Sequence, residues 1–281
     1  MYLKPETTAT ITLAIRHVLS CCMPKPCAFC PNDAVEHGGE HVWDNWLNKA
    51  LPKSRYRARK QYSNDSPLIE YDTHSLDEKL PVVCGDCNSG WMSVLTQKVK
   101  DRFGHAMLNG EPFSLGATDA AILASFTFMK AVVTNHINYS DTEPFFTRGA
   151  RERFRNSLAI PPSTKVWFAA FRGQSRMSTR NNLSLIGTSN PGPLFGIEFC
   201  SFTHVVGRLA LQLLAPRWKN INHRGRPLVS LTPNLLWEPA TTLFWPHGGD
   251  VLSWPPSKYL GDNMINAFIE RFANRVDLPT P

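Results

Sequence analysis

The sequence predicts an α+β protein with a small cysteine-bearing unit near the N-terminus and a larger segment of helices and antiparallel strands. Three observations predict this. Four of the seven cysteines form two C-x-x-C pairs, "CAFC" at 27–30 and "CGDC" at 84–87. The second pair leads into a stretch with apolar residues four positions apart, which is typical of a helix. From residue 164 onward, short apolar runs are bounded by Pro, Gly and Asn, which is typical of strands.

Length and composition favour two domains. A chain of 281 residues that is 42% hydrophobic can bury a large core. We expect an N-terminal extension over 1–26, a cysteine-bearing domain over 27–110 and an α+β domain over 111–281. Arg16 and His17 interrupt the apolar N-terminal run, and no run approaches the ~18 apolar residues that span a bilayer. We therefore expect a cytoplasmic protein without a membrane partner, and the net charge of +7 suits a polyanion such as nucleic acid.

The two C-x-x-C pairs predict a structural zinc site formed by Cys27, Cys30, Cys84 and Cys87. Each pair lies beside turn-forming residues, so that two thiolates can approach one corner of a tetrahedron. Four protein ligands leave no position open for water, which makes the ion structural. The alternative is a redox pair, for which one C-x-x-C would suffice. We interpret Cys21, Cys22 and Cys200 as small apolar residues.

The segment between the pairs contains two Glu-His dipeptides in "VEHGGEHVWDNW", residues 35–46. His37 and His41 could form a metal-binding H-x-x-x-H on a helix, but Gly38-Gly39 between them favours a turn or the connection of a hairpin. We therefore interpret His37 as a turn residue. A basic stretch follows, and its phosphate-binding candidates are Lys53, Arg55, Arg57, Arg59 and Lys60; a solvated basic loop explains them about equally well.

The order of these motifs resembles a known family. C-x-x-C, then an acidic residue with His and Val, then C-x-x-C-Asn-x-Gly-Trp is similar to the HNH endonucleases with a zinc-stapled ββα-metal core. The resemblance covers roughly residues 27–105 and implies a β-hairpin followed by a helix. It also implies that His41 is the general base of a DNA endonuclease and that Glu40 and Asn88 bind the catalytic ion.

The chemistry of phosphodiester hydrolysis fits these residue types. Histidine is the side chain that ordinarily titrates near neutral pH and can take a proton from water. A hard cation such as Mg²⁺ or Mn²⁺ accepts one carboxylate and one amide oxygen as its protein ligands. Two positions depart from the family. Glu40 stands where Asp is more frequent, and the middle residue of the motif has only Asn64 and His74 as candidates.

The segment after residue 110 contains no further catalytic motif. We expect helices over 115–138, 147–156 and 263–275, and strands at 165–171, 183–189, 194–202, 205–215 and 241–245. Its arrangement is similar to the C-terminal part of long bacterial and phage HNH proteins. Alternatives to an endonuclease are a non-catalytic zinc-stabilised nucleic-acid-binding module and an effector of defence systems or mobile elements. Such an effector would act with a partner protein or guide complex bound to the C-terminal domain, and a homodimer is also compatible with the sequence.

Overall fold

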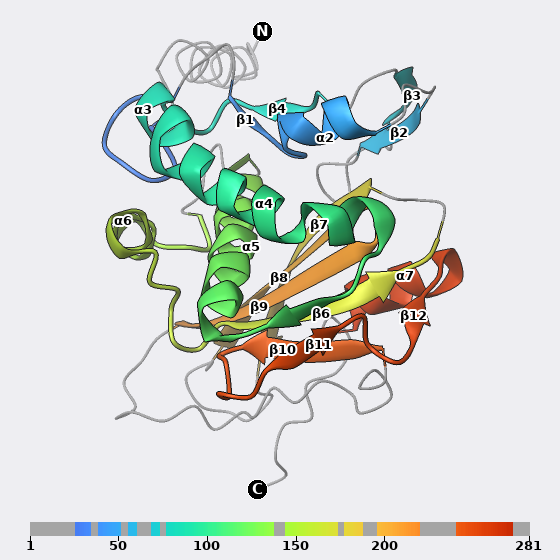
Figure 1. The fold of residues 1–281 in the computed structure, drawn as a ribbon. Coiled ribbons are helices and arrows are strands. Elements are labelled where there is room, and N and C mark those ends of the chain that lie inside the picture. Colours follow the sequence, from blue (N-terminus) through green and yellow to red (C-terminus); the bar gives the residue numbers. More distant parts are fainter. Residues whose placement is uncertain are drawn as a thin grey trace, which may run out of the picture.

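The structure is a computed structural model, and it describes residues 26–34, 39–51, 56–60, 69–73, 77–137, 144–173, 177–187, 196–219 and 240–271. These residues form helices and predominantly antiparallel sheets (Figure 1), which confirms the predicted α+β class. One hydrophobic core extends through both predicted segments, from Phe29 beside the cysteines to Trp254 near the end of the described chain.

A six-stranded sheet forms the base of the molecule. Its strands are β6 (Lys165–Phe171), β7 (Met177–Gly187), β8 (Gly196–Val206), β9 (Leu209–Lys219), β10 (Thr241–Trp245) and β12 (Tyr259–Leu260). The order is β10-β6-β9-β8-β7, antiparallel throughout, and β12 pairs with β6 in parallel. The sheet is buried on both faces, since alternate residues of β9 enter different clusters: Leu209 and Leu211 join the main core, while Ala210 joins a second cluster beneath α7 (Asp262–Glu270).

One predicted strand divides in the structure. The run 205–215 contains the end of β8, a turn at Gly207-Arg208 and the start of β9. Gly207 has φ 58°, and a Cβ there would lie 1.9 Å from the carbonyl oxygen of Met107. The neighbouring Arg208 N–H donates to that same carbonyl at 2.7 Å. The turn therefore docks on the end of a helix, a contact that local sequence does not indicate.

The predicted helices are present, with bounds shifted by a few residues. They are α4 (Ser93–Asn109), α5 (Ala117–Ile137), α6 (Arg148–Ser157) and α7. Helix α4 crosses α5 (Figure 1), and α5 contacts β7, β9 and β10 of the sheet. The strand β5 (Phe113–Leu115), which joins the two helices in sequence, pairs with β11 (Leu252–Trp254). Contrary to the expectation from sequence, Ala117–His136 is long and apolar enough to cross a membrane, but 67% of its most apolar window is buried inside the protein, as in a core helix.

The cysteine-bearing unit lies at the far side of α4 and α5 from the sheet (Figure 1). It contains β1 (Glu40–His41), α2 (Asn45–Ala50), β2 (Tyr56–Lys60), β3 (Ile69–Thr73), β4 (Lys79–Leu80), α3 (Gly85–Cys87) and the wide helical turn η1 (Asn88–Met92), which continues into α4. Strand β1 pairs antiparallel with β4, and β2 pairs with β3. Along the chain, the second strand of the β1–β4 pair is followed by α3, η1 and α4.

Gly39 packs against the backbone of β4. It directly precedes β1, whose partner strand β4 comes much later in the chain. A Cβ at Gly39 would lie 2.1 Å from the carbonyl oxygen of Leu80, so only glycine fits against this backbone. Residues 35–38, including Glu36 and His37, lie outside the described residues.

Candidate functional site: a cysteine cluster beside the Glu40-His41 strand

The four cysteines predicted as zinc ligands come together. Their Sγ atoms all lie within 4.8 Å of one another, and all four side chains are buried. The Sγ of Cys30 lies 3.5 Å from that of Cys84 and 3.7 Å from that of Cys87. Tetrahedral zinc with Zn–S bonds of about 2.3 Å requires sulfur atoms about 3.8 Å apart, so the cluster could hold a zinc ion. Cys200 is buried in β8, away from this group.

Backbone N–H groups and side chains hold the two cysteine pairs in this arrangement. The Sγ of Cys27 accepts hydrogen bonds from the N–H of Phe29, at 3.5 Å, and from the N–H of Cys84, at 3.3 Å. Burial raises the pKa of the Cys87 thiol. Burial acts in the same direction on Cys84, but hydrogen bonds from the Cys87 backbone and the Cys30 thiol outweigh it and lower its pKa. Sulfur atoms that accept N–H groups are suited to the thiolate form that binds metal.

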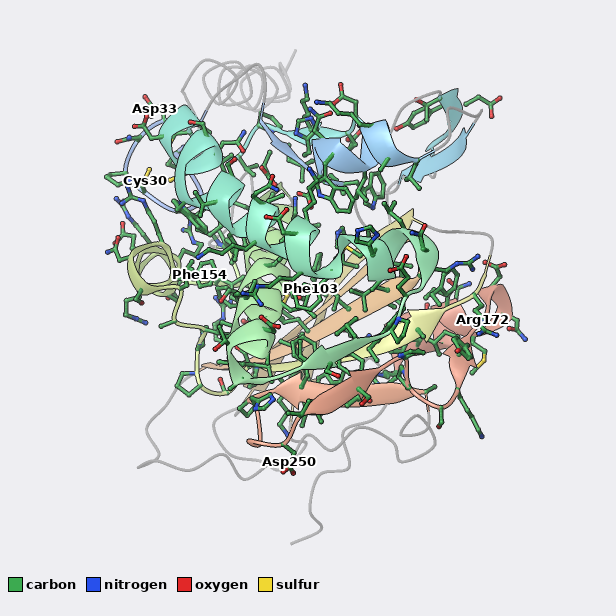
Figure 2. The ribbon with its side chains drawn as sticks, viewed as in Figure 1. Cys30, Asp33, Phe103, Phe154, Arg172 and Asp250 are labelled. Carbon is green, nitrogen blue, oxygen red and sulfur yellow. The ribbon has the colours of Figure 1, made fainter. Side chains whose placement is uncertain are left out.

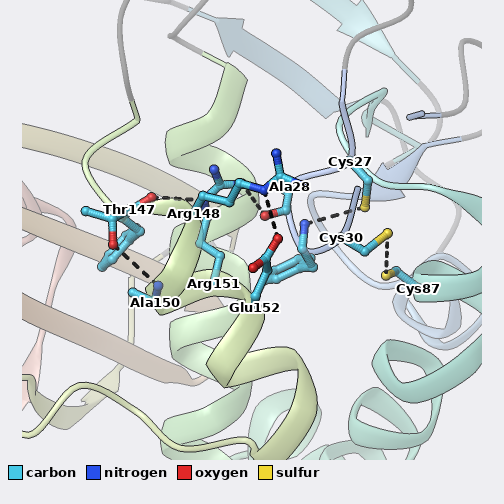
Figure 3. A network of polar contacts seen from close by, with 11 residues as sticks. Cys27, Ala28, Cys30, Cys87, Thr147, Arg148, Ala150, Arg151 and Glu152 are labelled. Atoms are coloured by element: carbon cyan, nitrogen blue, oxygen red, sulfur yellow. Dashed lines mark hydrogen bonds and ion pairs between the residues drawn. The ribbon is translucent and has the colours of Figure 1, made fainter. Parts of the chain in front are cut away.

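Helix α6 supports the first cysteine pair from the side (Figure 3). The guanidinium of Arg151, whose residue is 7% exposed, donates through Nη1 to the carbonyl of Ala28 and through Nε to the carbonyl of Phe146, the latter at 2.9 Å. Phe154 of the same helix packs edge to face on Trp91, with ring centroids 5.7 Å apart. In Figure 2, Phe154 lies on the side of α6 that faces α5, where its ring centroid is 4.7 Å from that of Phe128. Arg151 is therefore a buried residue of α6 that holds the cysteine-bearing loop in place.

His41 of β1 is paired with a carboxylate that sequence analysis missed. Its Nε2 lies 2.9 Å from Oδ1 of Asp77, which in turn lies 3.5 Å from the ammonium of Lys79. The His41 side chain is 21% exposed. A carboxylate only accepts hydrogen bonds, so in the neutral imidazole Nε2 carries the proton and the lone pair is on Nδ1. The arrangement orients an imidazole that is reachable from solvent and able to accept a proton at Nδ1.

Glu40 points in the opposite direction and is buried in an ion cluster. The ammonium of Lys130, from α5, lies 2.6 Å from Oε1 of Glu40, 2.7 Å from Oδ1 of Asp44 and 2.8 Å from the carbonyl oxygen of His41. Burial alone would lower the pKa of Lys130, but the carboxylates of Asp44 and Glu40 outweigh it and raise this pKa to about 12. Lys130 is therefore a permanent cation at neutral pH, and Glu40 and Asp44 are its counterions.

Asn88 reaches the same strand from the helix side. It follows Cys87 directly, at the start of η1, and its Nδ2 donates to the carbonyl of Gly39 at 3.2 Å. With Nδ2 occupied, the amide oxygen Oδ1 is the atom that can bind a cation. Two of the three predicted active-site residues, Glu40 and His41, directly follow the residue to which Asn88 bonds.

The structure tests the other predicted site residues only in part. Lys53, Arg55, Asn64 and His74 lie outside the described residues. Arg57, Arg59 and Lys60 lie on β2, where the register sets Arg57 opposite Asp72 and Arg59 opposite Glu70.

The roles of Lys130 and Asp77 were difficult to predict from the sequence. Lys130 is the single lysine of an otherwise strongly apolar helix, which is a signal that could have marked it as a buried, paired charge. Asp77 lies in a stretch without a motif, and nothing in the sequence joins it to His41.

Comparisons with known proteins identify no relative. No protein-family model, no curated protein and no solved structure matches the chain.

Proposed function

We propose that this chain is a metal-dependent DNA endonuclease built on a zinc-bound HNH core. Strands β1 and β4 would be the two strands of the ββα-metal unit, and α3, η1 and α4 its helix. The observation that carries the proposal is the hydrogen bond from Asn88, at the start of the helix, to Gly39, which directly precedes Glu40-His41. It joins the helix and the strand at the residues that the motif predicts to act together. The cluster of four thiols beside this contact supports a structural zinc ion in the core.

His41 would activate the attacking water. With Asp77 accepting a hydrogen bond from the Nε2–H group, Nδ1 of His41 takes a proton from water as the oxygen forms a bond to phosphorus. The bond from phosphorus to the 3′ oxygen breaks, and that oxygen takes up a proton from solvent. The products would carry a 5′ phosphate and a 3′ hydroxyl. Asp77 would hold the tautomer and direction of the ring, in the manner of an acid-histidine pair.

Glu40 and Asn88 are proposed to hold a Mg²⁺ or Mn²⁺ ion. Their oxygen atoms are the hard ligands that these ions prefer. Lys130 bonds to Oε1 of Glu40, and a carboxylate with one hydrogen-bonded oxygen retains acceptor capacity on the other. When bound, the ion would neutralise charge on the scissile phosphate. The basic residues of 53–60 and the net charge of +7 would contribute to DNA binding.

A second function has one observation in its favour. Glu40 is only 6% exposed and is engaged by a cation of the protein itself. This favours a zinc-stabilised nucleic-acid-binding module in which Glu40 has a structural role and no metal is bound beside it. Such a protein would bind DNA and leave it intact.

A cleavage assay distinguishes the two. Zinc-loaded protein is incubated with supercoiled plasmid, linear duplex and single-stranded DNA in Mg²⁺, Mn²⁺ or EDTA, and product ends are tested for a 5′ phosphate. The endonuclease proposal predicts nicking or cutting of at least one form with Mg²⁺ or Mn²⁺ and none in EDTA. Binding of DNA without cleavage of any form in either metal would establish the binding module and reject the endonuclease.

A further inference from the structure

Lys130 makes an unusual set of contacts for a side chain of a core helix. It is the only lysine or arginine of α5, and its side chain is 2% exposed. An ammonium has three N–H donors, and three acceptors surround this one: Glu40 Oε1, Asp44 Oδ1 and the carbonyl oxygen of His41. All three belong to the short stretch formed by β1 and the turn into α2. Lys130 thus binds both residues of β1 and the turn that follows it.

The ion cluster takes the place of a helix cap at the start of α2. Asp44 is the N-cap of α2, a position at which an aspartate usually accepts a hydrogen bond from the helix backbone. Here its side chain makes no cap hydrogen bond and binds Lys130. Two carboxylates, 7% and 8% exposed, surround one ammonium, which gives the buried cluster a net charge of −1. Burying three charges is costly when the only result is adhesion of a helix to a strand, because apolar residues do this as well or better.

The direction of His41 follows from these contacts. Successive residues of a strand point to opposite faces, so a strand whose Glu40 side chain is held on the buried face must present the His41 imidazole on the other. Lys130 also binds the carbonyl of His41 itself, which fixes the backbone that carries the ring. On that other face the imidazole meets Asp77.

We propose that Lys130 is a positioning residue of the active site: its ammonium holds the carboxylate of Glu40 and the backbone carbonyl of His41, and thereby sets the direction of the His41 imidazole on the other face of β1. This rests on the endonuclease function proposed above. Carboxylates that bind metals are themselves hydrogen-bonded by neighbouring groups, and loss of such a neighbour typically costs 10- to 100-fold in metal affinity or activity. Helix α5 thereby contributes to the site through Lys130, which contacts Glu40 and His41 and does not contact the substrate.

The test compares three zinc-loaded variants with the wild type: Lys130→Met/Asp44→Asn, Asp44→Asn alone, and the exposed control Lys98→Met on α4. The double variant keeps the net charge of the cluster at −1 but lacks the ammonium. Zinc content and circular dichroism establish folding, and all rates are measured below the lowest unfolding temperature. The readouts are Mn²⁺ affinity by electron paramagnetic resonance without DNA, and kcat and KM for plasmid nicking.

We expect the folded double variant to bind Mn²⁺ about 10- to 100-fold more weakly than Asp44→Asn and to lose a similar factor in kcat, with KM for DNA little changed. Lys98→Met should match the wild type. Equal Mn²⁺ affinity and kcat in the double variant and Asp44→Asn would overturn the proposal, since a merely structural lysine affects stability alone. If the double variant fails to retain zinc, Lys130→Arg takes its place in the test, because a planar guanidinium cannot reproduce three diverging contacts. Wild-type Mn²⁺ affinity and kcat in Lys130→Arg would then overturn the positioning role of Lys130. A wild type that neither binds Mn²⁺ nor cleaves rejects the endonuclease function itself.

Discussion

Replacing Arg151 by methionine should destabilise the cysteine unit from a distance. The guanidinium donates to the carbonyls of Ala28 and Phe146, and the residue is 7% exposed. Methionine keeps the apolar stem but removes both hydrogen bonds. A hydrogen bond from a charged donor contributes about 1.5–3 kcal/mol, so the loss should be at least about 3 kcal/mol. For a chain of this size that corresponds to a fall in Tm of roughly 6–12 °C.

Differential scanning calorimetry measures the effect, and release of zinc to a colorimetric chelator reports on the cysteine unit itself. Arg155→Met is the matched control, because Arg155 is exposed on the same helix and such changes usually stay within about 0.5 kcal/mol. We expect Arg151→Met to melt earlier and to release zinc faster than Arg155→Met. Equal Tm values for the two variants, together with weaker DNA binding by Arg151→Met, would refute the bracing role and favour a helix that contacts DNA.

Three further predictions concern the site. Asp77→Asn should lower kcat by about 10- to 100-fold, because the His41 ring loses the charge that orients it. This is part of the about 10²–10⁴-fold that a general base contributes. The control variant Asp250→Asn, at an exposed residue, should cleave as the wild type does. Cys84→Ser should abolish binding of about one zinc ion per chain in elemental analysis, whereas Cys200→Ser should retain it; zinc retained by Cys84→Ser would contradict the assigned ligands. Lys130 has its pKa raised from 10.5 to about 12, so its ion pairs add about 2 kcal/mol below pH 10.5 that is lost as pH rises through 12. The unfolding free energy of the wild type should therefore fall by about 2 kcal/mol relative to that of Lys130→Met over that window, and a constant difference would show that the carboxylates do not raise this pKa.

Sequence patterns predicted the parts of this protein that depend on local spacing. Two C-x-x-C pairs were sufficient to identify the cysteine cluster, because the knuckle geometry is set within each pair. The apolar stripe of α4 and the run 165–171 of β6 were equally readable, since each has a period that fixes its structure.

Long-range contacts could not be predicted in this way. The partner of β1 is β4, and nothing in either two-residue strand specifies the other. Lys130 meets Glu40 only because α5 crosses beneath β1, and the pairing of Asp77 with His41 depends on where the chain returns before the second cysteine pair. The turn at Gly207 was missed for the same reason, because its requirement for glycine comes from the end of α4.

The central claim is that His41 takes the proton from the attacking water. The most direct measurement is the rate of plasmid nicking by His41→Ala in Mg²⁺, relative to His105→Ala, which replaces a histidine with a 78% exposed side chain on α4. A general base contributes about 10²–10⁴-fold, so we expect His41→Ala to retain zinc and bind DNA but to nick at least about 100-fold more slowly than His105→Ala. Equal nicking rates in the two variants would contradict the account.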